Sequence, residues 1–258
     1  MDRRTFLKVV PAAMLAAAAP SLAAQAVTTA PSSRAADTGP SSTAGAAVTA
    51  NLAGNLQAIA LPKPQTDGGK SVLAALQERR TIRTISEEKL SPQMLSNLLW
   101  AAFGGNREGG PSARVGRTAA SASNSQEIDL YVALPEGVYL YEAVAHRLVP
   151  VVAGDLRAKV GRGRGGRGAK APVRLIYVVD IAKYGRGSPQ EPGLKDPEIQ
   201  KSYYNIATGL IAGNVYLFAA SQGLAAWFHN CDKPGLTEAL HLRPEQRVLY
   251  GQTVGHPA

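Results

Sequence analysis

Apolar residues recur along most of the chain at the two spacings that distinguish helices from strands. Helical spacing predicts helices over residues 71–80, 92–103, 155–160, 196–222 and 236–240. Two of them have clear start signals, because Ser91-Pro92 and Asp196-Pro197 each combine an N-cap residue with proline at the first helical position. From Ile206 onward the long helix is apolar nearly all round, which predicts burial inside the domain or between subunits.

Strands are predicted between these helices. Residues 128–134 alternate as in a half-buried strand, and further strands are expected over 138–141, 148–152, 224–228 and 248–254. Residues 173–179 are a continuous run rich in β-branched side chains, as expected of a strand buried on both faces. A polar, glycine-rich loop is expected over 106–116. The pattern predicts an α+β fold with a mixed sheet, flanking helices and one long central hydrophobic helix.

The first 26 residues have the features of a twin-arginine signal peptide. Arg3-Arg4 precedes an eleven-residue apolar run, Val9 to Ala19, and small residues suited to cleavage follow. An uncleaved anchor helix is the alternative, but the run is interrupted by Pro11 and shorter than the roughly 20 residues a span needs. We therefore expect export to the periplasm or another extracytoplasmic space, without a stable membrane anchor. Because proteins on this route cross already folded, the segment also favours a bound cofactor.

Residues 27–65 are rich in Ala, Ser, Thr, Pro and Gly, and this composition predicts a flexible linker. Residues 66–258 are long enough for one folded domain. The net charge of +9 falls to about +7 without residues 1–26, which contribute +2. That charge is below the density of a dedicated nucleic-acid binder, so no nucleic-acid partner is expected. The single cysteine, Cys231, allows no internal disulfide.

Several motifs that would carry other chemistry fail on context or spacing. Gly161 to Gly166 matches a dinucleotide-binding fingerprint, but it follows a helix-like stretch and precedes a strand, so a mobile surface loop is expected. No G-x-S-x-G elbow is present, and the four histidines lack metal-ligand spacing. Neither a catalytic side chain nor a metal site is therefore predicted. A basic module that binds polyanions through Arg162, Arg164 and Arg167 remains an alternative.

Two polar segments remain as candidate binding sites. Arg79-Arg80-Thr81-Ile82-Arg83 places three guanidinium groups and a hydroxyl within five positions, a set that suits a phosphate. The alternative is a solvated helix end, where cations complement the C-terminal dipole. Thr118 to Gln126 is small, polar and rich in hydrogen-bonding groups, so a planar polar ring could approach it closely, although a plain loop has the same composition.

The order and spacing of these pieces, over about residues 70–258, resemble the nitroreductase family of flavoproteins. The segment from Arg79 to Arg83 is similar to that family's phosphate-binding signature, and Ser121 to Gln126 resembles its Pro-Ser-Ser-x-Asn-x-Gln segment. Gly209 to Gly223 resembles its interface helix, and Val254 to Pro257 its terminal motif. The stretch from Glu127 to Leu156 is closer to the SagB-type dehydrogenase branch.

There are also departures from the family pattern. Ala120 stands where the family has proline, and Ala122 where it has serine. The basic residue that completes the family's phosphate site further downstream has no counterpart in this sequence.

The resemblance implies a role for each matching residue. Its cofactor would be FMN, bound at the interface of a homodimer whose core is the long helix. Arg79, Arg80 and Arg83 would hold the FMN phosphate, with a hydroxyl contact from Thr81. The remaining matches concern the isoalloxazine ring: Ser121 and Asn124 would reach it from the other subunit, and His229 and Asn230 would lie at its reactive edge.

The resemblance also implies the reaction. The flavin would carry out the chemistry, in a ping-pong transfer of hydride through N5 to a small organic acceptor. Small molecules would serve as electron donor and acceptor. Because nicotinamide cofactors are scarce outside the cytoplasm, a quinone or a redox protein remains open as the partner. The alternative is a non-catalytic exported protein that binds a flavin or another ligand on the same fold.

Overall fold

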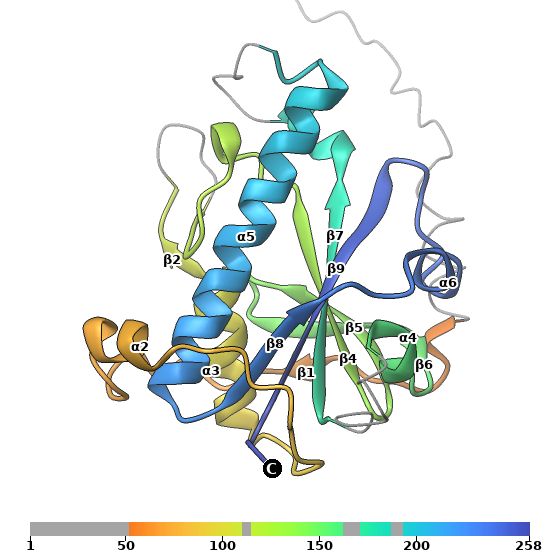
Figure 1. Cartoon of the computed structure of the whole chain (residues 1–258). Coiled ribbons are helices and arrows are strands. Elements are labelled where there is room, and N and C mark those ends of the chain that lie inside the picture. Colours follow the sequence, from red (N-terminus) through yellow and green to blue (C-terminus); the bar gives the residue numbers. More distant parts are fainter. Residues whose placement is uncertain (1–51, 110–114, 162–170, 187–192) are drawn as a thin grey trace, which may run out of the picture. The chain divides into compact units, whose positions relative to one another are not determined.

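The computed structural model describes residues 52–109, 115–161, 171–186 and 193–258, which form an α+β fold (Figure 1). The main sheet has seven strands in the order β1-β6-β5-β4-β7-β9-β8. They are β1 Ile59–Ala60, β4 Ile128–Leu134, β5 Gly137–Glu142, β6 Arg147–Ala153, β7 Val173–Asp180, β8 Ala225–His229 and β9 Gln246–Gly255. Every residue of β7 is buried, which confirms the prediction of a central strand.

The sheet is antiparallel throughout, whereas the sequence predicted a mixed sheet. The difference arises around β9. Strands β7 and β8 are joined by the long helix, as in a parallel strand–helix–strand unit, but β9 lies between them and is antiparallel to both. The local order of elements cannot reveal that a later strand is inserted between two earlier ones.

The predicted helices are present. They are α2 Val72–Glu78, α3 Pro92–Phe103, α4 Arg157–Val160, α5 Pro197–Ser221 and α6 Lys233–Ala239, with short 3-10 turns η1 Ala122–Asn124 and η3 Ile181–Arg186. Both start signals are confirmed: the side chain of Ser91 accepts a hydrogen bond from Met94 N at 3.1 Å, and that of Asp196 accepts one from Glu198 N at 2.9 Å. None of the helices in the described ranges could cross a membrane, given their length and polarity.

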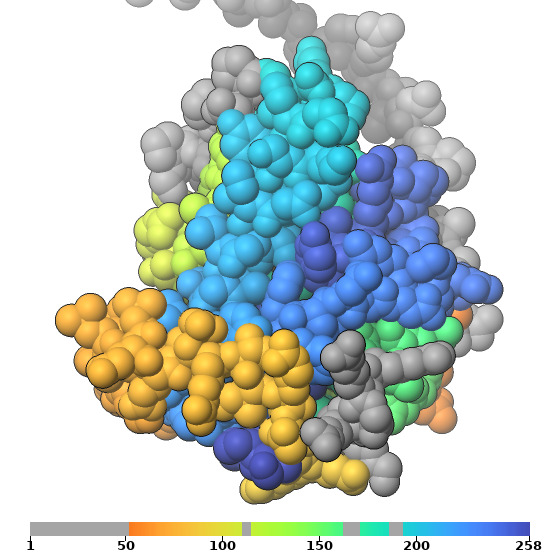
Figure 2. Space-filling model, viewed as in Figure 1, coloured from red at the N-terminus to blue at the C-terminus, as the bar shows by residue number. Residues whose placement is uncertain are grey.

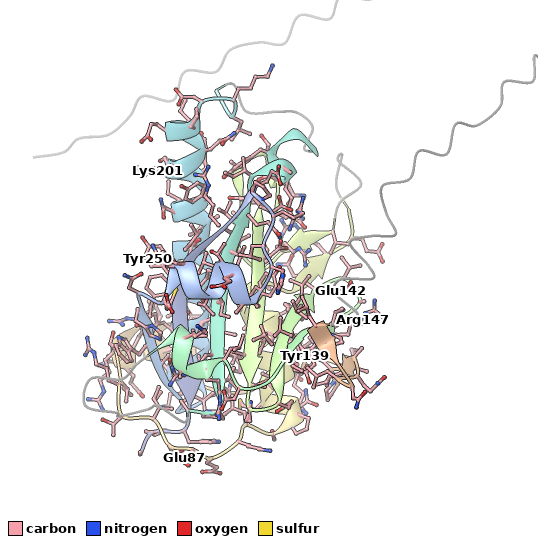
Figure 3. The ribbon with its side chains drawn as sticks, turned by 90° about the vertical axis from the view of Figure 1, so that its right-hand side faces the viewer. Glu87, Tyr139, Glu142, Arg147, Lys201 and Tyr250 are labelled. Atoms are coloured by element: carbon pink, nitrogen blue, oxygen red, sulfur yellow. The ribbon has the colours of Figure 1, made fainter. Side chains whose placement is uncertain are left out.

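Side chains from the two faces of the sheet form two separate hydrophobic cores. On β4, Leu130 and Val132 pack with α3 and α5, whereas Tyr131 and Ala133 pack with α4 and α6. This alternation follows from the two-residue period of a strand. Figure 3 looks onto the second face, where α6 lies in front of the strands and the ion pair Glu142–Arg147 joins β5 to β6.

Helix α5 is only partly buried within one chain, so full burial inside the domain is not observed. Its Ile211 and Val215 pack in the first core, but Ile206 and Leu210 are 55% and 45% exposed. In Figure 2 the side chains of α5 form much of the outer surface on the viewer's side. Helix α2 buries only Ala75 and exposes the apolar residues Val72, Leu73 and Leu76.

Two predicted loops are in fact structured. The segment 52–65, expected to be linker, supplies β1, which pairs with β6 and forms the edge of the sheet, while Leu56 and Leu61 pack against the first core. The two ends of the loop expected over 106–116 belong to a small two-stranded sheet, β2 Gly105–Arg107 with β3 Gly116–Arg117. The predicted signal peptide, linker residues 27–51 and Arg162, Arg164 and Arg167 all lie outside the described residues.

Candidate functional site

The arginine-rich segment runs beside β8, on the outer edge of the sheet (Figure 1). Ile82 N donates a hydrogen bond to Ala226 O at 3.1 Å, which ties the segment to the strand. The hydroxyl of Thr81 lies 3.1 Å from that of Tyr216, which in turn accepts a hydrogen bond from Phe228 N at 2.8 Å. The segment is therefore fixed by α5 and β8 together.

Three arginines, Arg79, Arg80 and Arg83, form what we call the arginine strip. The guanidinium carbon of Arg79 lies 5.5 Å from the ring centre of Tyr216, and that of Arg83 lies 5.7 Å from the ring of Trp227. Contacts of this kind orient a cation without neutralising it. All three side chains are exposed, and none takes part in an ion pair with any described residue.

The strip is more than a charged helix end. Helix α2 ends at Glu78 with Arg79 as its C-cap, so only Arg79 sits where the helix dipole favours a cation. Arg83 lies four residues further on and packs over Trp227 of β8. The positive charge therefore follows the edge of the sheet, and its arrangement favours an anionic ligand.

His229 lies on the same side of β8 as Trp227, with the two ring centres 4.6 Å apart. Its Nδ1 donates to Asn230 O at 2.8 Å, and its Nε2 accepts from the hydroxyl of Thr253, also at 2.8 Å. Burial lowers the pKa of His229, and the hydrogen bond to Asn230 opposes this only in part. The ring is thus neutral and held firmly, while Asn230 is exposed at the end of the strand.

Behind His229 lies a buried cation that sequence reasoning missed. Arg174 on β7 is 1% exposed, and its guanidinium donates to the carbonyl oxygens of Arg157 and Gly161. A Cβ atom on Gly161 would lie 2.8 Å from His229 and 2.9 Å from Arg174, so the glycine permits this close approach. Burial lowers the pKa of Arg174 to about 10, which leaves it charged at neutral pH. An isolated arginine in an apolar strand gave no signal of such a role.

The segment 121–126 occupies a different place, on the side of α5 that faces α3. Asn214 of α5 donates through Nδ2 to Thr118 O at 3.2 Å and holds the start of the loop. Within the loop, Gln126 N donates to Ser121 Oγ, and Gln126 Nε2 donates to Asn124 Oδ1, both at 3.0 Å.

The backbone of this loop is in an unusual conformation. Ser123, Asn124 and Gln126 have φ values of 48°, 51° and 51°, which side chains other than glycine rarely adopt. Such conformations persist only where the surroundings fix them, and they cluster at functional sites.

The predicted site residues therefore fall into two groups within one chain. Arg79, Thr81, Arg83 and His229 come together along β8, with Arg80 exposed between them and Asn230 at the strand end. Ser121 and Asn124 lie with Thr118 and Asn214 instead. The aromatic residues that support the strip, Tyr216 and Trp227, were not predicted as site residues, because each fits the apolar pattern of its own helix or strand. Among the described residues, no three His, Cys, Asp or Glu side chains gather in a way that could hold a metal ion.

Comparison of the chain with known proteins identifies its family. The model of the nitroreductase family matches residues 76–256. A solved structure from Ralstonia eutropha, described as a nitroreductase, shares 33% identity with a TM-score of 0.68, over 79% of this chain and 90% of that one. The chain therefore belongs to the nitroreductase family, and its fold is that of the family's oxidoreductases.

More distant structures share the fold alone. A protein from Anabaena variabilis, also described as a nitroreductase, is 18% identical with a TM-score of 0.59, over 78% of this chain and 42% of that one. The E. coli microcin synthetase complex McbBCD, solved with truncated pro-MccB17 bound, is 17% identical with a TM-score of 0.58, over 86% and 85%. No curated protein matches the sequence.

Proposed function

We propose that this protein is an FMN-dependent oxidoreductase of the SagB-type branch, which transfers hydride to a small organic acceptor in a ping-pong cycle. The proposal rests on the arginine strip beside β8, whose three cations form no ion pair with a described residue. Two of them, Arg79 and Arg83, lie over the rings of Tyr216 and Trp227. Membership of the nitroreductase family supports the class of reaction.

The residues present fit a flavin mononucleotide. Arg79 and Arg83 would donate paired hydrogen bonds to its phosphate, Arg80 would add a third cation and Thr81 a hydroxyl. His229 and Asn230 would lie at its reactive edge, and the buried charge of Arg174 would favour negative charge developing there. When bound, FMN supplies the hydride chemistry itself. The chain binds and orients it, which agrees with the lack of any predicted nucleophile.

We further propose a homodimer built on α5. Exposed Ile206 and Leu210 form an apolar stripe that is unusual for a surface helix. Pairing two such helices would bury the stripe and bring Ser121 and Asn124 of the partner subunit to the flavin ring. Leu210→Glu is expected to convert the dimer to monomer, as measured by sedimentation velocity. Val144→Glu, at an exposed apolar position between β5 and β6 and outside α5, should leave the dimer intact.

The proposed location is extracytoplasmic, with export by the twin-arginine route. A quinone or a redox protein would then be the electron partner rather than a nicotinamide. Replacing both Arg3 and Arg4 by lysine should retain the protein in the cytoplasm, as judged by fractionation. Rapid stoichiometric reduction of the bound flavin by NADPH would argue against the proposed partner.

The deciding experiment is the absorbance spectrum of the purified protein, followed by initial-rate kinetics. A yellow preparation with flavin bands, and parallel double-reciprocal plots for donor and acceptor, would support the proposal. A yellow protein that turns over no donor would favour the non-catalytic flavin carrier instead. A colourless protein that takes up no added FMN would refute both.

A further inference from the structure

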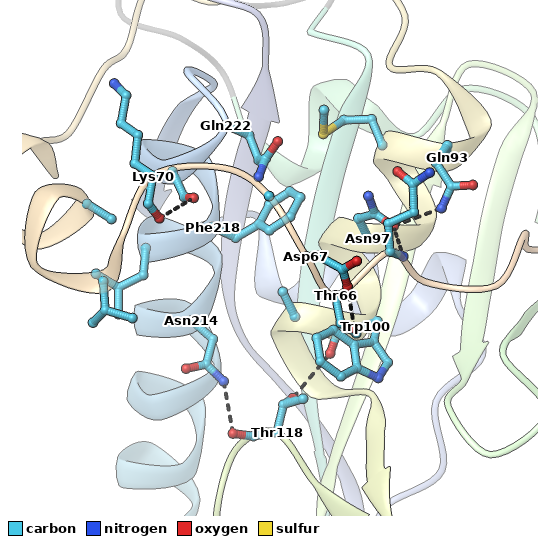
Figure 4. Close-up of a pocket in the computed structure, with 18 of the residues that line it drawn as sticks. Thr66, Asp67, Lys70, Gln93, Asn97, Trp100, Thr118, Asn214, Phe218 and Gln222 are labelled. Atoms are coloured by element: carbon cyan, nitrogen blue, oxygen red, sulfur yellow. Dashed lines mark hydrogen bonds between the residues drawn. The ribbon is translucent and has the colours of Figure 1, made fainter.

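A cavity of about 540 Å³ lies between α2, α3 and α5, within the usual size range of small-molecule sites (Figure 4). One of its walls is residues 61–70, which we call the strap. The strap supplies the lining residues Gln65, Thr66, Asp67, Gly68 and Lys70. Because the family match begins at residue 76, the wall precedes the part of the chain that defines the family.

One end of the strap is fastened to α3 by side-chain hydrogen bonds. Ser96 Oγ donates to Pro62 O at 2.5 Å, and Gln93 Nε2 donates to Lys63 O at 2.9 Å. Ser96 also contacts the ring of His146 at 2.7 Å, and Leu61 N donates to His146 O at 3.3 Å. These bonds fix the path of the strap across α3.

The other end is fastened to α5. Lys70 N donates to Ser221 O at 3.2 Å, and Ser221 Oγ donates back to Lys70 O at 3.1 Å. Gly69 has a φ of +73°, and a Cβ atom there would lie 2.4 Å from both Ser221 Oγ and Gln222 Nε2. Only glycine allows the strap to turn and approach the helix so closely. The strap therefore bridges α3 and α5 and closes one side of the cavity.

Two carboxamides in the lining keep one polar atom each for a ligand. Asn97 Oδ1 accepts hydrogen bonds from Gln65 N at 2.8 Å and Gln93 Nε2 at 2.9 Å, which identifies Nδ2 as the remaining donor. Asn214 Nδ2 donates to Thr118 O at 3.2 Å, which leaves Oδ1 as an acceptor. Neither remaining atom is bonded to another described residue. The cavity thus offers one fixed donor and one fixed acceptor.

The lining has two aromatic residues and two charged ones. Of the charged residues, Asp67 accepts a hydrogen bond from Thr66 and has no ion pair with a described residue, so it repels an anionic ligand. Trp100 and Phe218 both face the cavity (Figure 4), and Trp100 is held by a hydrogen bond from Nε1 to Gly105 O at 2.9 Å. Lys70, a cation of the lining, is paired with Glu78. Flat apolar surfaces favour a planar ring. Because Lys70 is already paired with Glu78, it offers little attraction to an anionic ligand.

We propose that the strap, α3 and α5 form a binding site for a small uncharged aromatic amide. The ring of the ligand would contact Trp100 and Phe218, and its carbonyl would accept from Asn97 Nδ2. The site stands on its own geometry and does not depend on flavin binding at the arginine strip.

Tryptophan fluorescence provides the test, because Trp100 and Trp227 are the only two tryptophans. In a Trp227→Phe background, titration with benzamide should quench Trp100 to saturation, with or without added FMN. Benzoate, which has the same ring but a negative charge, should bind at least tenfold more weakly. Cyclohexanecarboxamide, which lacks the flat ring, should also bind at least tenfold more weakly than benzamide.

Variants then test the residues. Asn97→Asp keeps the hydrogen-bond acceptor but loses the donor, and Phe218→Leu keeps the apolar volume but loses the aromatic ring. Each variant should weaken the binding of benzamide by about tenfold, which corresponds to ~1.4 kcal/mol. Asn205→Asp is the matched polar control. Gly69→Ala should also weaken binding, whereas Gly154→Ala, with a positive φ but no neighbouring atom within 4 Å, should not. Absence of saturable quenching, or equal affinity for benzamide and benzoate, would overturn the proposal.

Discussion

The arginine strip and the strapped cavity are both attached to α5, yet they are suited to opposite kinds of ligand. Tyr216 supports the strip, whereas Asn214, two residues earlier, lines the cavity. Two residues on a helix are about 200° apart, so neighbours in sequence face opposite sides. On one side, exposed guanidinium groups are oriented by rings and remain charged. On the other, amide groups are fixed by hydrogen bonds and remain neutral. One helix can therefore separate anion binding from the binding of neutral molecules.

The largest effect should come from reversing charge in the strip. The double variant Arg79→Glu/Arg83→Glu should weaken FMN binding by at least ~100-fold, since hydrogen bonds to charged groups contribute roughly 1.5–3 kcal/mol each. Riboflavin, which lacks the phosphate, should be nearly unaffected, and so should benzamide. Isothermal titration calorimetry measures all three.

The matched control is Arg247→Glu, an exposed arginine on β9 away from β8. If the double variant loses affinity for FMN and for riboflavin equally, the strip does not bind the phosphate. If the double variant also loses affinity for benzamide, the two sites are not separate.

A smaller effect is expected from Tyr216→Phe. The change removes the hydroxyl that accepts from Phe228 N and contacts Thr81, so the free energy of unfolding should fall by about 1–2 kcal/mol. Urea denaturation followed by circular dichroism measures it. Tyr250→Phe serves as the control, because its ring also packs against Phe228 but its hydroxyl makes no hydrogen bond to another described residue. Equal losses in both variants would show that the hydroxyl does not anchor the segment.

The smallest effect concerns the strap and pH. Burial lowers the pKa of His146, whose Nδ1 contacts the hydroxyl of Tyr141 at 2.9 Å. The unfolded chain therefore binds more protons than the folded one below about pH 6.5, so stability falls as the pH falls through this region. His146→Gln cannot be protonated and should lose about one or two degrees less in Tm than wild type between pH 7 and pH 5. An unchanged pH dependence in a calorimetric scan would exclude His146 as a contributor.

Local signals account for most of the elements that were predicted correctly. Helix α3 begins at Pro92 because Ser91 caps it, and both residues are adjacent in sequence. Strand β7 was predicted from its own composition. By contrast, β1 has two residues and exists only because the edge of β6 is available for pairing. The exposure of Ile206 and Leu210 was equally hidden, since a helix that is apolar all round does not reveal which side lacks a neighbour.

In the candidate site, too, some features could be predicted from neighbouring residues and others depend on distant ones. The cationic character of Arg79 to Arg83 could be predicted because charge and hydrogen-bonding geometry belong to the side chains themselves, and phosphate binding by this segment stays a prediction. That Tyr216 and Trp227 would orient these arginines could not, because they follow more than 130 residues later. Arg174 gave no signal for the same reason, since its position behind His229 depends on strand order and on the small size of Gly161.

By itself the sequence determined the family, the order of helices and most strands, and the chemical character of the strip, because these depend on residues close together in the chain. Only the tertiary structure decided that β9 separates β7 from β8, that the strip follows the edge strand β8, and that the strap closes a cavity against α3 and α5. Those features depend on contacts between distant segments. Their formation is governed by packing and hydrogen-bond pairing in three dimensions, which no short stretch of residues encodes.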